Sequence, residues 1–241
     1  LMDLGKMPRD LADVLVRMSI ASPAICAYRS NGNNSVYATQ LAKILINQFN
    51  KPEATAIVEL AYGKTNNDAH WKNTLAYCRD GNIQAMLDEY IHMLVESNGL
   101  TNSDNKHENV HILMVNSMKT HSASYTIDTY KTFKKNIKSS KKQRGVALRT
   151  HYAVGFYKGE GVTSKVVVRK ESIRNSFNSP FRPFVLATTS IGQEGLDFHF
   201  YCRRIMHWNL PSNPIDLEQR EGRINRFKCL AIRQNIARKY D

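Results

Sequence analysis

The sequence predicts an α/β protein: a parallel sheet with flanking helices, preceded by a small all-α helical region. Three observations predict this class. Apolar residues recur at helical spacing through the first hundred positions, a polar stretch at 97–109 interrupts that pattern, and short apolar runs then alternate with helical segments. Such alternation is typical of a parallel sheet with crossover helices. We therefore expect a helical accessory region over 1–100 and a separate α/β domain over 108–241.

The helical region is predicted from three apolar stripes, at 11–18, 41–45 and 83–94. The first has apolar residues at positions i, i+3, i+4 and i+7, which places them on one helical face. Such stripes usually form a core, and they do not indicate what this region does. The expected breaks between helices fall at three glycines, Gly32, Gly63 and Gly81.

The α/β domain is predicted element by element from local patterns. Short apolar runs predict buried strands at 110–117, 145–148, 184–189 and 204–208. Amphipathic segments predict helices at 126–138 and 170–177. A last helix is expected to begin with Asn213 as its N-cap and Pro214 at its first helical position.

Composition excludes several classes of protein. The 241 residues are 42% apolar, which is enough for a core and excludes wholesale disorder. No apolar run approaches the roughly 18 residues of a membrane span, and no signal peptide opens the chain. The four cysteines are scattered, which argues against a zinc site and against a disulfide scaffold. We therefore expect a cytoplasmic protein with no metal ligands of its own and no membrane partner.

The net charge of +13 is concentrated in two segments. Residues 126–150 carry eight basic residues against one acidic residue, and residues 203–239 carry nine against three. A lysine-rich surface can simply keep a protein soluble. Two segments that hold the whole excess instead favour a polyanionic partner, which is a nucleic acid or a nucleotide.

One apparent phosphate-binding motif does not meet its pattern. Gly63-Lys64-Thr65 resembles the end of a P-loop, but that motif requires a glycine where the chain has Val58. The preceding residues are also predicted to be helical, whereas a P-loop follows a buried strand. We do not expect a P-loop here.

The strongest signal combines two motifs, FVLATTSIGQEGLDFH and QREGRINR. The first is a predicted buried strand that leads into a glycine-bearing loop. In the second, Gln219, Arg223 and Arg226 are expected on one helical face, and paired guanidinium groups suit a polyphosphate. The alternative is that these arginines are solvated and pair with Glu218 and Glu221.

These motifs resemble the fifth and sixth motifs of superfamily-two helicases and translocases. TTSIGQEGLD is similar to the T-x(5)-G-x-D loop of the family, and QREGRINR is similar to its Q-x-x-G-R-x-x-R helix. The resemblance is to the C-terminal, second RecA-like lobe of bacterial members related to Swi/Snf-type and phage-defence helicases. It covers about 108–230 and is most specific over 176–227. Ser190 stands where DEAD-box members often have aspartate, which places the chain outside that branch.

The resemblance implies roles for two groups of residues. One group would act on ATP: Arg223 and Arg226 as catalytic arginine fingers, with Gln219, Arg220, Gly222, Gly195 and Asp197 binding the nucleotide. The other group would hold the nucleic-acid backbone: Thr189, Gly192, Asn116, Ser117 and Lys119. Glycine allows the backbone to approach a phosphate closely, and loop amides can bind an anion.

The resemblance also implies partners that the chain does not contain. ATP and Mg²⁺ would be held mainly by the N-terminal RecA-like lobe of the same polypeptide, because neither a P-loop nor an acidic magnesium motif is found in these 241 residues. We therefore expect an ATP-dependent helicase or translocase acting on nucleic acid, DNA in preference to RNA, whose isolated second lobe has no ATPase activity. The alternative is a non-catalytic nucleic-acid-binding or protein-docking module that retains a motor fold.

Overall fold

The computed structural model describes most of the chain, and it divides into two compact units. The units are Leu1–Met118 and Lys119–Asp241. The described residues are 6–63, 70–119, 122–127, 129–138, 146–151, 164–181, 183–188 and 197–240.

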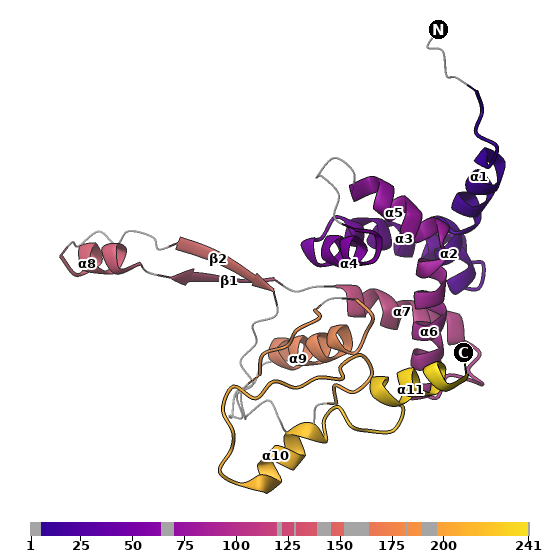
Figure 1. Ribbon diagram of the computed structural model, residues 1–241. Helices are drawn as coiled ribbons and strands as arrows, with labels where there is room; N and C mark the ends of the chain where they lie inside the picture. Colours follow the sequence, from indigo (N-terminus) through magenta and orange to yellow (C-terminus); the bar gives the residue numbers. More distant parts are fainter. Residues whose placement is uncertain are drawn as a thin grey trace. The chain divides into compact units, whose positions relative to one another are not determined.

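Every helix or strand among the described residues of the first unit is an α-helix (Figure 1). Its helices are α1 (Leu11–Ile20), α2 (Pro23–Ser30), α3 (Ser35–Phe49), α4 (Pro52–Tyr62), α5 (His70–Arg79), α6 (Asn82–Ser97) and α7 (Lys106–Met118). Helix α2 packs on α3 and α6, α7 packs on the same two helices, and α4 packs on α5. The helices expected over the first hundred residues are thus present.

Two of the three apolar stripes, at 41–45 and 83–94, contribute to the core of this unit, whereas α1, which holds the stripe at 11–18, has no buried residue. Leu41, Leu87 and Met114, from α3, α6 and α7, are fully buried, and Tyr90 is 2% exposed. Burial raises the pKa of Tyr90 to about 12. Because these two stripes follow the helical period, α3 and α6 each bury one face against their neighbours.

Helix ends in the first unit follow from local chemistry. Asn34 caps α3 because its side-chain oxygen accepts hydrogen bonds from the backbone amides of Val36 and Tyr37, at 3.0 and 3.2 Å. Gly81 precedes α6 with a φ of 80°, a conformation that glycine adopts without the steric cost of a Cβ. The chain therefore turns sharply between α5 and α6.

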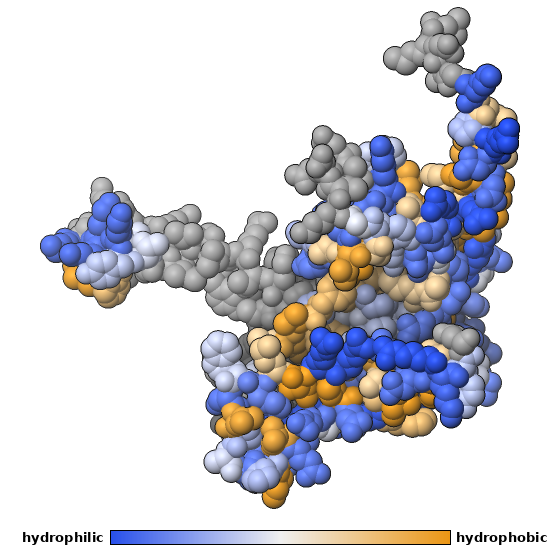
Figure 2. All heavy atoms as spheres, in the orientation of Figure 1, coloured by the Kyte–Doolittle hydropathy of each residue, from blue (hydrophilic) through white to orange (hydrophobic). Residues whose placement is uncertain are grey.

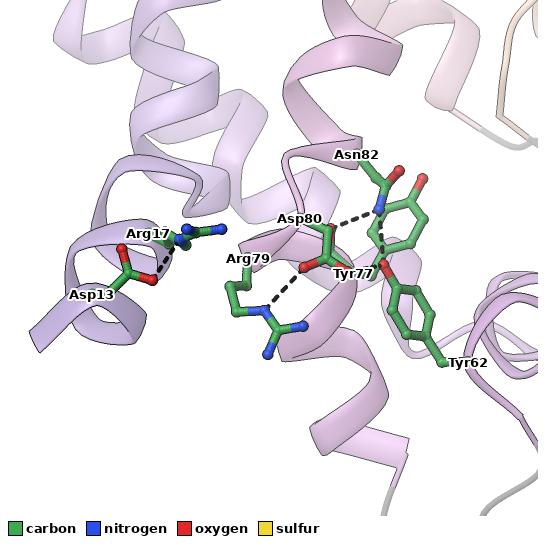
Figure 3. A network of polar contacts seen from close by, with 7 residues as sticks. All are labelled: Asp13, Arg17, Tyr62, Tyr77, Arg79, Asp80 and Asn82. Atoms are coloured by element: carbon green, nitrogen blue, oxygen red, sulfur yellow. Dashed lines mark hydrogen bonds and ion pairs between the residues drawn. The ribbon is translucent and has the colours of Figure 1, made fainter. Parts of the chain in front are cut away.

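A polar network joins the end of α4 to the turn between α5 and α6 (Figure 3). The Tyr62 hydroxyl donates to the Asp80 carboxylate at 2.8 Å, and Arg79 Nε lies 2.9 Å from the same carboxylate. Asn82 Nδ2 donates to the Tyr62 hydroxyl at 3.0 Å. The hydrogen bonds from Arg79 and Tyr62, in that order of effect, lower the pKa of Asp80. The network therefore stabilises the carboxylate form.

The second unit contains helices and one pair of strands among its described residues. The elements are β1 (Ser122–Ile127), α8 (Tyr130–Lys138), β2 (Val146–His151), α9 (Ser164–Phe177), α10 (Pro214–Glu221) and α11 (Leu230–Tyr240). Strands β1 and β2 are antiparallel, from Ser122 opposite His151 to Ile127 opposite Val146. Figure 1 shows α8 at the end of this ribbon.

The predicted parallel sheet of the second unit is wrong for the described part of the chain. Only β1 and β2 pair there, and they pair antiparallel. The RecA-like sheet expected over 108–230 is therefore not the fold of this structure. The helices α8, α9 and α10 do lie within or overlap the segments that predicted them. Strand β2 also begins within its predicted run.

Three predicted strands have a different structure. The run 110–117 lies inside α7, where Val110, Met114 and Met118 are buried at helical spacing. The residues described in 184–189 are irregular, and so are those of 204–208. A short apolar run cannot by itself distinguish a strand from a buried helix.

No single described helix is long and apolar enough to cross a membrane. Helices α1 and α2 meet that criterion only when they are taken together, across a bend of 40°.

Candidate functional site

The candidate site lies in the second unit, where the segment that begins at Asp197 meets the turn that follows α10. The amide of Phe198 donates to the carbonyl oxygen of Arg223 at 3.3 Å. The amide of Leu230 donates to the carbonyl oxygen of His199 at 2.9 Å. Two backbone hydrogen bonds thus bring together parts of the chain that are about thirty residues apart in sequence.

The local sequence explains where α10 begins and ends. Asn213 is its N-cap, since its side-chain oxygen accepts the Ile215 amide at 3.1 Å, and Pro214 follows as predicted. The helix ends at Glu221, and Gly222 is its C-cap. The amides of Arg223 and Ile224 then donate to carbonyl oxygens three residues earlier, which describes tight turns in place of a continued α-helix.

The prediction that Gln219, Arg223 and Arg226 share one face of a helix is therefore wrong, because α10 ends at Glu221. Gln219 and Arg220 lie on α10, whereas both other arginines lie in the turn beyond it. Gln219 is exposed. Arg220 donates from Nη1 to the carbonyl oxygen of Asn209 at 3.0 Å. Its buried Nε has no hydrogen-bond partner among the described residues.

An ion pair connects the two sequence motifs directly. Arg226 Nη1 lies 2.5 Å from Asp197 Oδ1, with side chains that are 47% and 43% exposed. Arg226 Nε also donates to the carbonyl oxygen of Gly222 at 3.3 Å. The guanidinium group is therefore oriented by two partners while about half of its side chain remains accessible.

Arg223 lies beside this pair and is partly buried. Burial lowers the pKa of its guanidinium group, the charge of Arg226 lowers it further, and the Asp197 carboxylate opposes both effects. Arginine nevertheless stays protonated in proteins. Among the described residues, Asp197 is thus the carboxylate that acts on both guanidinium groups.

Three residues that the sequence analysis did not single out hold the site in place. Asn178 Nδ2 donates to the carbonyl oxygen of Asp197 at 2.5 Å. Arg233 donates to the carbonyl oxygens of Lys228 and Phe200, at 2.7 and 2.8 Å. Phe198 is buried and meets Phe177 edge-on, with ring centroids 5.5 Å apart. Asn178 lies in the stretch 176–227, where the resemblance is most specific, whereas Arg233 lies in α11, beyond that stretch.

His199 lies next to the ion pair and is buried. Burial lowers its pKa, and the charges of Arg226 and Arg233 act in the same direction, whereas Asp197 acts in the opposite direction. The neutral form of the imidazole is therefore favoured. Among the described residues, no three His, Cys, Asp or Glu side chains are grouped as metal ligands would be.

The residues predicted to contact nucleic acid are placed differently. Thr189, Gly192 and Gly195 lie outside the described residues. Asn116 and Ser117 lie in α7 of the first unit, not at the end of a strand, and Lys119 follows that helix. The Ser117 hydroxyl is buried and donates to the carbonyl oxygen of Met114 at 2.7 Å.

Comparison with known proteins identifies the family of the chain. Residues 68–228, which are more than half of the sequence, match the helicase conserved C-terminal domain. The chain belongs to this family. The predicted resemblance to the C-terminal lobe of a superfamily-two helicase is confirmed at that level. Neither the curated proteins nor the solved structures give a significant match.

The helicase C-terminal match includes every residue of the candidate site named above except those of α11. It begins in the first unit, upstream of the segment that carried the sequence resemblance. Both sequence motifs therefore lie within the matched region, together with the ion pair that joins them.

Proposed function

We propose that this helicase C-terminal domain is the second lobe of an ATP-dependent nucleic-acid motor, in which Arg226 and Arg223 act on the phosphates of ATP. The observation that carries the proposal is the ion pair between Arg226 and Asp197. It joins the glycine-bearing loop motif to the arginine motif at one place. An arginine that is oriented but still accessible is what phosphate recognition requires.

The energetics of the pair suit an exchange of partners. A half-exposed ion pair contributes about 0–1 kcal/mol to stability, because water and salt screen it. A phosphate that approaches Arg226 therefore has little to displace. The guanidinium fork can then form two parallel hydrogen bonds to phosphate oxygens.

The neighbouring charges also favour an anion. Arg223 and Arg226 repel each other, and the Asp197 carboxylate opposes that repulsion. A phosphate placed between the guanidinium groups would relieve that repulsion. It would also complement charge that spreads over the γ-phosphate oxygens during phosphoryl transfer.

The remaining parts of the motor would come from outside this chain. ATP and Mg²⁺ would be held mainly by a first RecA-like lobe of the same polypeptide, and bound ATP supplies the phosphoanhydride bond that is hydrolysed. Gln219, Arg220 and Gly222 would support the nucleotide side. The loop from Thr189 to Gly195 would grip the backbone of a nucleic acid, with DNA preferred over RNA.

The test uses a protein that carries both lobes and measures ATPase activity stimulated by nucleic acid. Arg226→Ala and Arg223→Ala should each lower turnover at least about a hundredfold, since an arginine finger contributes roughly 10³–10⁵ in rate. Arg226→Lys should restore little, because an ammonium group cannot form the planar fork. ATP affinity should change much less, since the first lobe holds the ground-state nucleotide.

Arg9→Ala is the matched control, because Arg9 is an exposed arginine that lies outside both basic segments. Its turnover should equal that of the unaltered protein. Normal turnover in both Arg223→Ala and Arg226→Ala would refute the catalytic role. A non-catalytic module that binds nucleic acid or protein would then be the better description.

A further inference from the structure

Helix α8 presents an apolar stripe to solvent. Its nine residues contain Tyr130, Phe133 and Ile137, which are 75%, 54% and 68% exposed. At about 100° per residue, the three side chains lie within about 60° of arc on one face. Large apolar side chains that gather on one exposed face indicate a surface that binds something.

The face of α8 next to the apolar stripe carries lysines. Lys131, Lys134, Lys135 and Lys138 are exposed, and α8 contains no acidic residue. They occupy about 100° of arc next to the apolar stripe. Lys134 Nζ lies 5.8 Å from the centre of the Tyr130 ring. Figure 2 shows the hydrophilic and hydrophobic side chains on different sides of α8.

The start of the helix is fixed by a reciprocal cap. The Thr132 amide donates to the Thr129 hydroxyl oxygen at 3.2 Å, and the Thr129 amide donates to the Thr132 hydroxyl oxygen at 3.1 Å. Two amides that lack intrahelical partners are thereby satisfied. The two faces are thus presented by a capped helix.

We infer that α8 is a binding site for single-stranded nucleic acid, in which bases stack on Tyr130 and Phe133 while the lysines contact the phosphates. The inference rests on the proposed function, because that function supplies a nucleic acid as partner. It adds a contact outside the two helicase motifs and a preference for unpaired strands. Charge complementarity selects a polyanion, and the paired aromatic rings select one with exposed bases.

The geometry explains the preference for single strands. Side chains three residues apart on a helix have Cβ atoms about 5–6 Å apart, so neighbouring unpaired bases can each reach one ring. In a duplex, the faces of the bases are covered by their own stacking. The lysines, on the adjacent face, would still attract either form through its phosphates.

The first experiment tests stacking with the full chain and fluorescence anisotropy. The probes are a labelled oligothymidylate and a labelled duplex of the same length. The double variant Tyr130→Leu/Phe133→Leu keeps the apolar face but removes both rings. Affinity for the single strand should fall at least about tenfold, because each base stacked on a ring contributes measurably. Affinity for the duplex should stay unchanged.

Two further variants control this measurement. Tyr130→Trp/Phe133→Trp keeps both rings and should bind the single strand at least as well as the unaltered chain. Trp71→Leu removes an exposed aromatic residue of α5 that also has a lysine over its ring. It should leave binding unchanged. Circular dichroism confirms that each variant keeps its helical content.

The second experiment tests the lysine face through the salt dependence of binding. Lys134→Gln/Lys135→Gln/Lys138→Gln should reduce the slope of log affinity against log salt by about 2, at roughly 0.7 for each lost phosphate contact. Lys6→Gln/Lys43→Gln/Lys72→Gln removes the same charge from exposed lysines of the first unit. Its slope should stay close to that of the unaltered chain.

Several outcomes would overturn the inference. Unchanged single-strand affinity in the leucine double variant would exclude stacking. Binding to vesicles of phosphatidylserine and phosphatidylcholine that survives the leucine substitutions, without any single-strand preference, would identify an anionic membrane as the ligand. These results leave the ATPase test untouched. Loss of ATPase activity in Arg226→Ala with normal binding in the α8 variants would therefore refute this inference alone.

Discussion

The two units of the chain differ in how their large apolar side chains are buried. In the first unit, large side chains such as Leu41, Leu87 and Met114 are fully buried between helices. In the second unit, Val185, Met206 and Trp208 are 84%, 90% and 97% exposed. Figure 2 shows hydrophobic surface in the region of α10 as well. A helix can bury its apolar face against a neighbour close in sequence, whereas an apolar extended segment requires partners from distant parts of the chain.

The largest expected effect tests this contrast with truncations in the two units. Leu87→Ala should lower the free energy of unfolding by about 2–5 kcal/mol, because it leaves a cavity in a closed core. Val185→Ala and Met206→Ala should each change it by less than about 0.5 kcal/mol, as exposed positions do. Urea unfolding followed by circular dichroism measures both. A loss at Val185 equal to that at Leu87 would show that the apolar segment is buried in solution.

A smaller effect is expected from the buried polar cluster of the first unit. His111 is buried, its Nδ1 lies 2.8 Å from Asn31 Oδ1, and its ring stacks on Tyr37 with centroids 4.3 Å apart. His111→Phe should keep the stacking but leave the buried Asn31 oxygen without that donor. The free energy of unfolding should fall by roughly 1–3 kcal/mol.

The matched control for this substitution is His92→Phe. The His92 side chain is 67% exposed and lies 3.5 Å from Glu96. Its replacement should shift the urea midpoint very little. Equal shifts for the two histidines would mean that the hydrogen bonds of His111 do not stabilise the first unit.

The smallest effect concerns the pH dependence of the second unit. Because burial lowers the pKa of His199, the neutral form is favoured in the folded chain and protonation favours unfolding. Stability should be fully present above the ordinary histidine pKa of about 6.5 and should decrease as the pH falls below it. His199→Phe should flatten this decrease. Thermal unfolding of both proteins, measured above and below the ordinary histidine pKa, tests this expectation. An equally steep decrease in the variant would contradict the assignment to His199.

Local signals in the sequence were the ones that predicted structure correctly. Asn213 and Pro214 fix the start of α10 through their own chemistry, and the 126–138 segment shows the period of α8. The run 110–117 misled because it contains only two helical turns of α7, whose start at Lys106 lies in a polar stretch. The pairing of β1 with β2 joins segments that are distant in sequence, and local patterns do not indicate which strands pair.

The candidate site was predictable only in part for the same reason. Arg226 and Asp197 were both singled out from the motifs, but their ion pair required the turn after Gly222 to meet the segment that follows the loop. Asn178 lies in the stretch 176–227 and Arg233 lies beyond it, but both were missed because each donates to backbone carbonyl oxygens, and the motifs assign no role of that kind. Residues that bind a ligand are easier to recognise than residues that position them.

The ribbon of β1 and β2 also works as a spacer of defined length. Its six residue pairs extend about 20 Å, at roughly 3.4 Å for each residue of an antiparallel strand. Because side chains alternate between the faces of a strand, adding two residues to each strand would move α8 outward by about 7 Å and keep its orientation to the ribbon. Adding one residue to each would instead turn the helix toward the other face. The reach of α8 can therefore change without its orientation when the strands lengthen in steps of two residues, whereas a change of orientation always changes the reach as well.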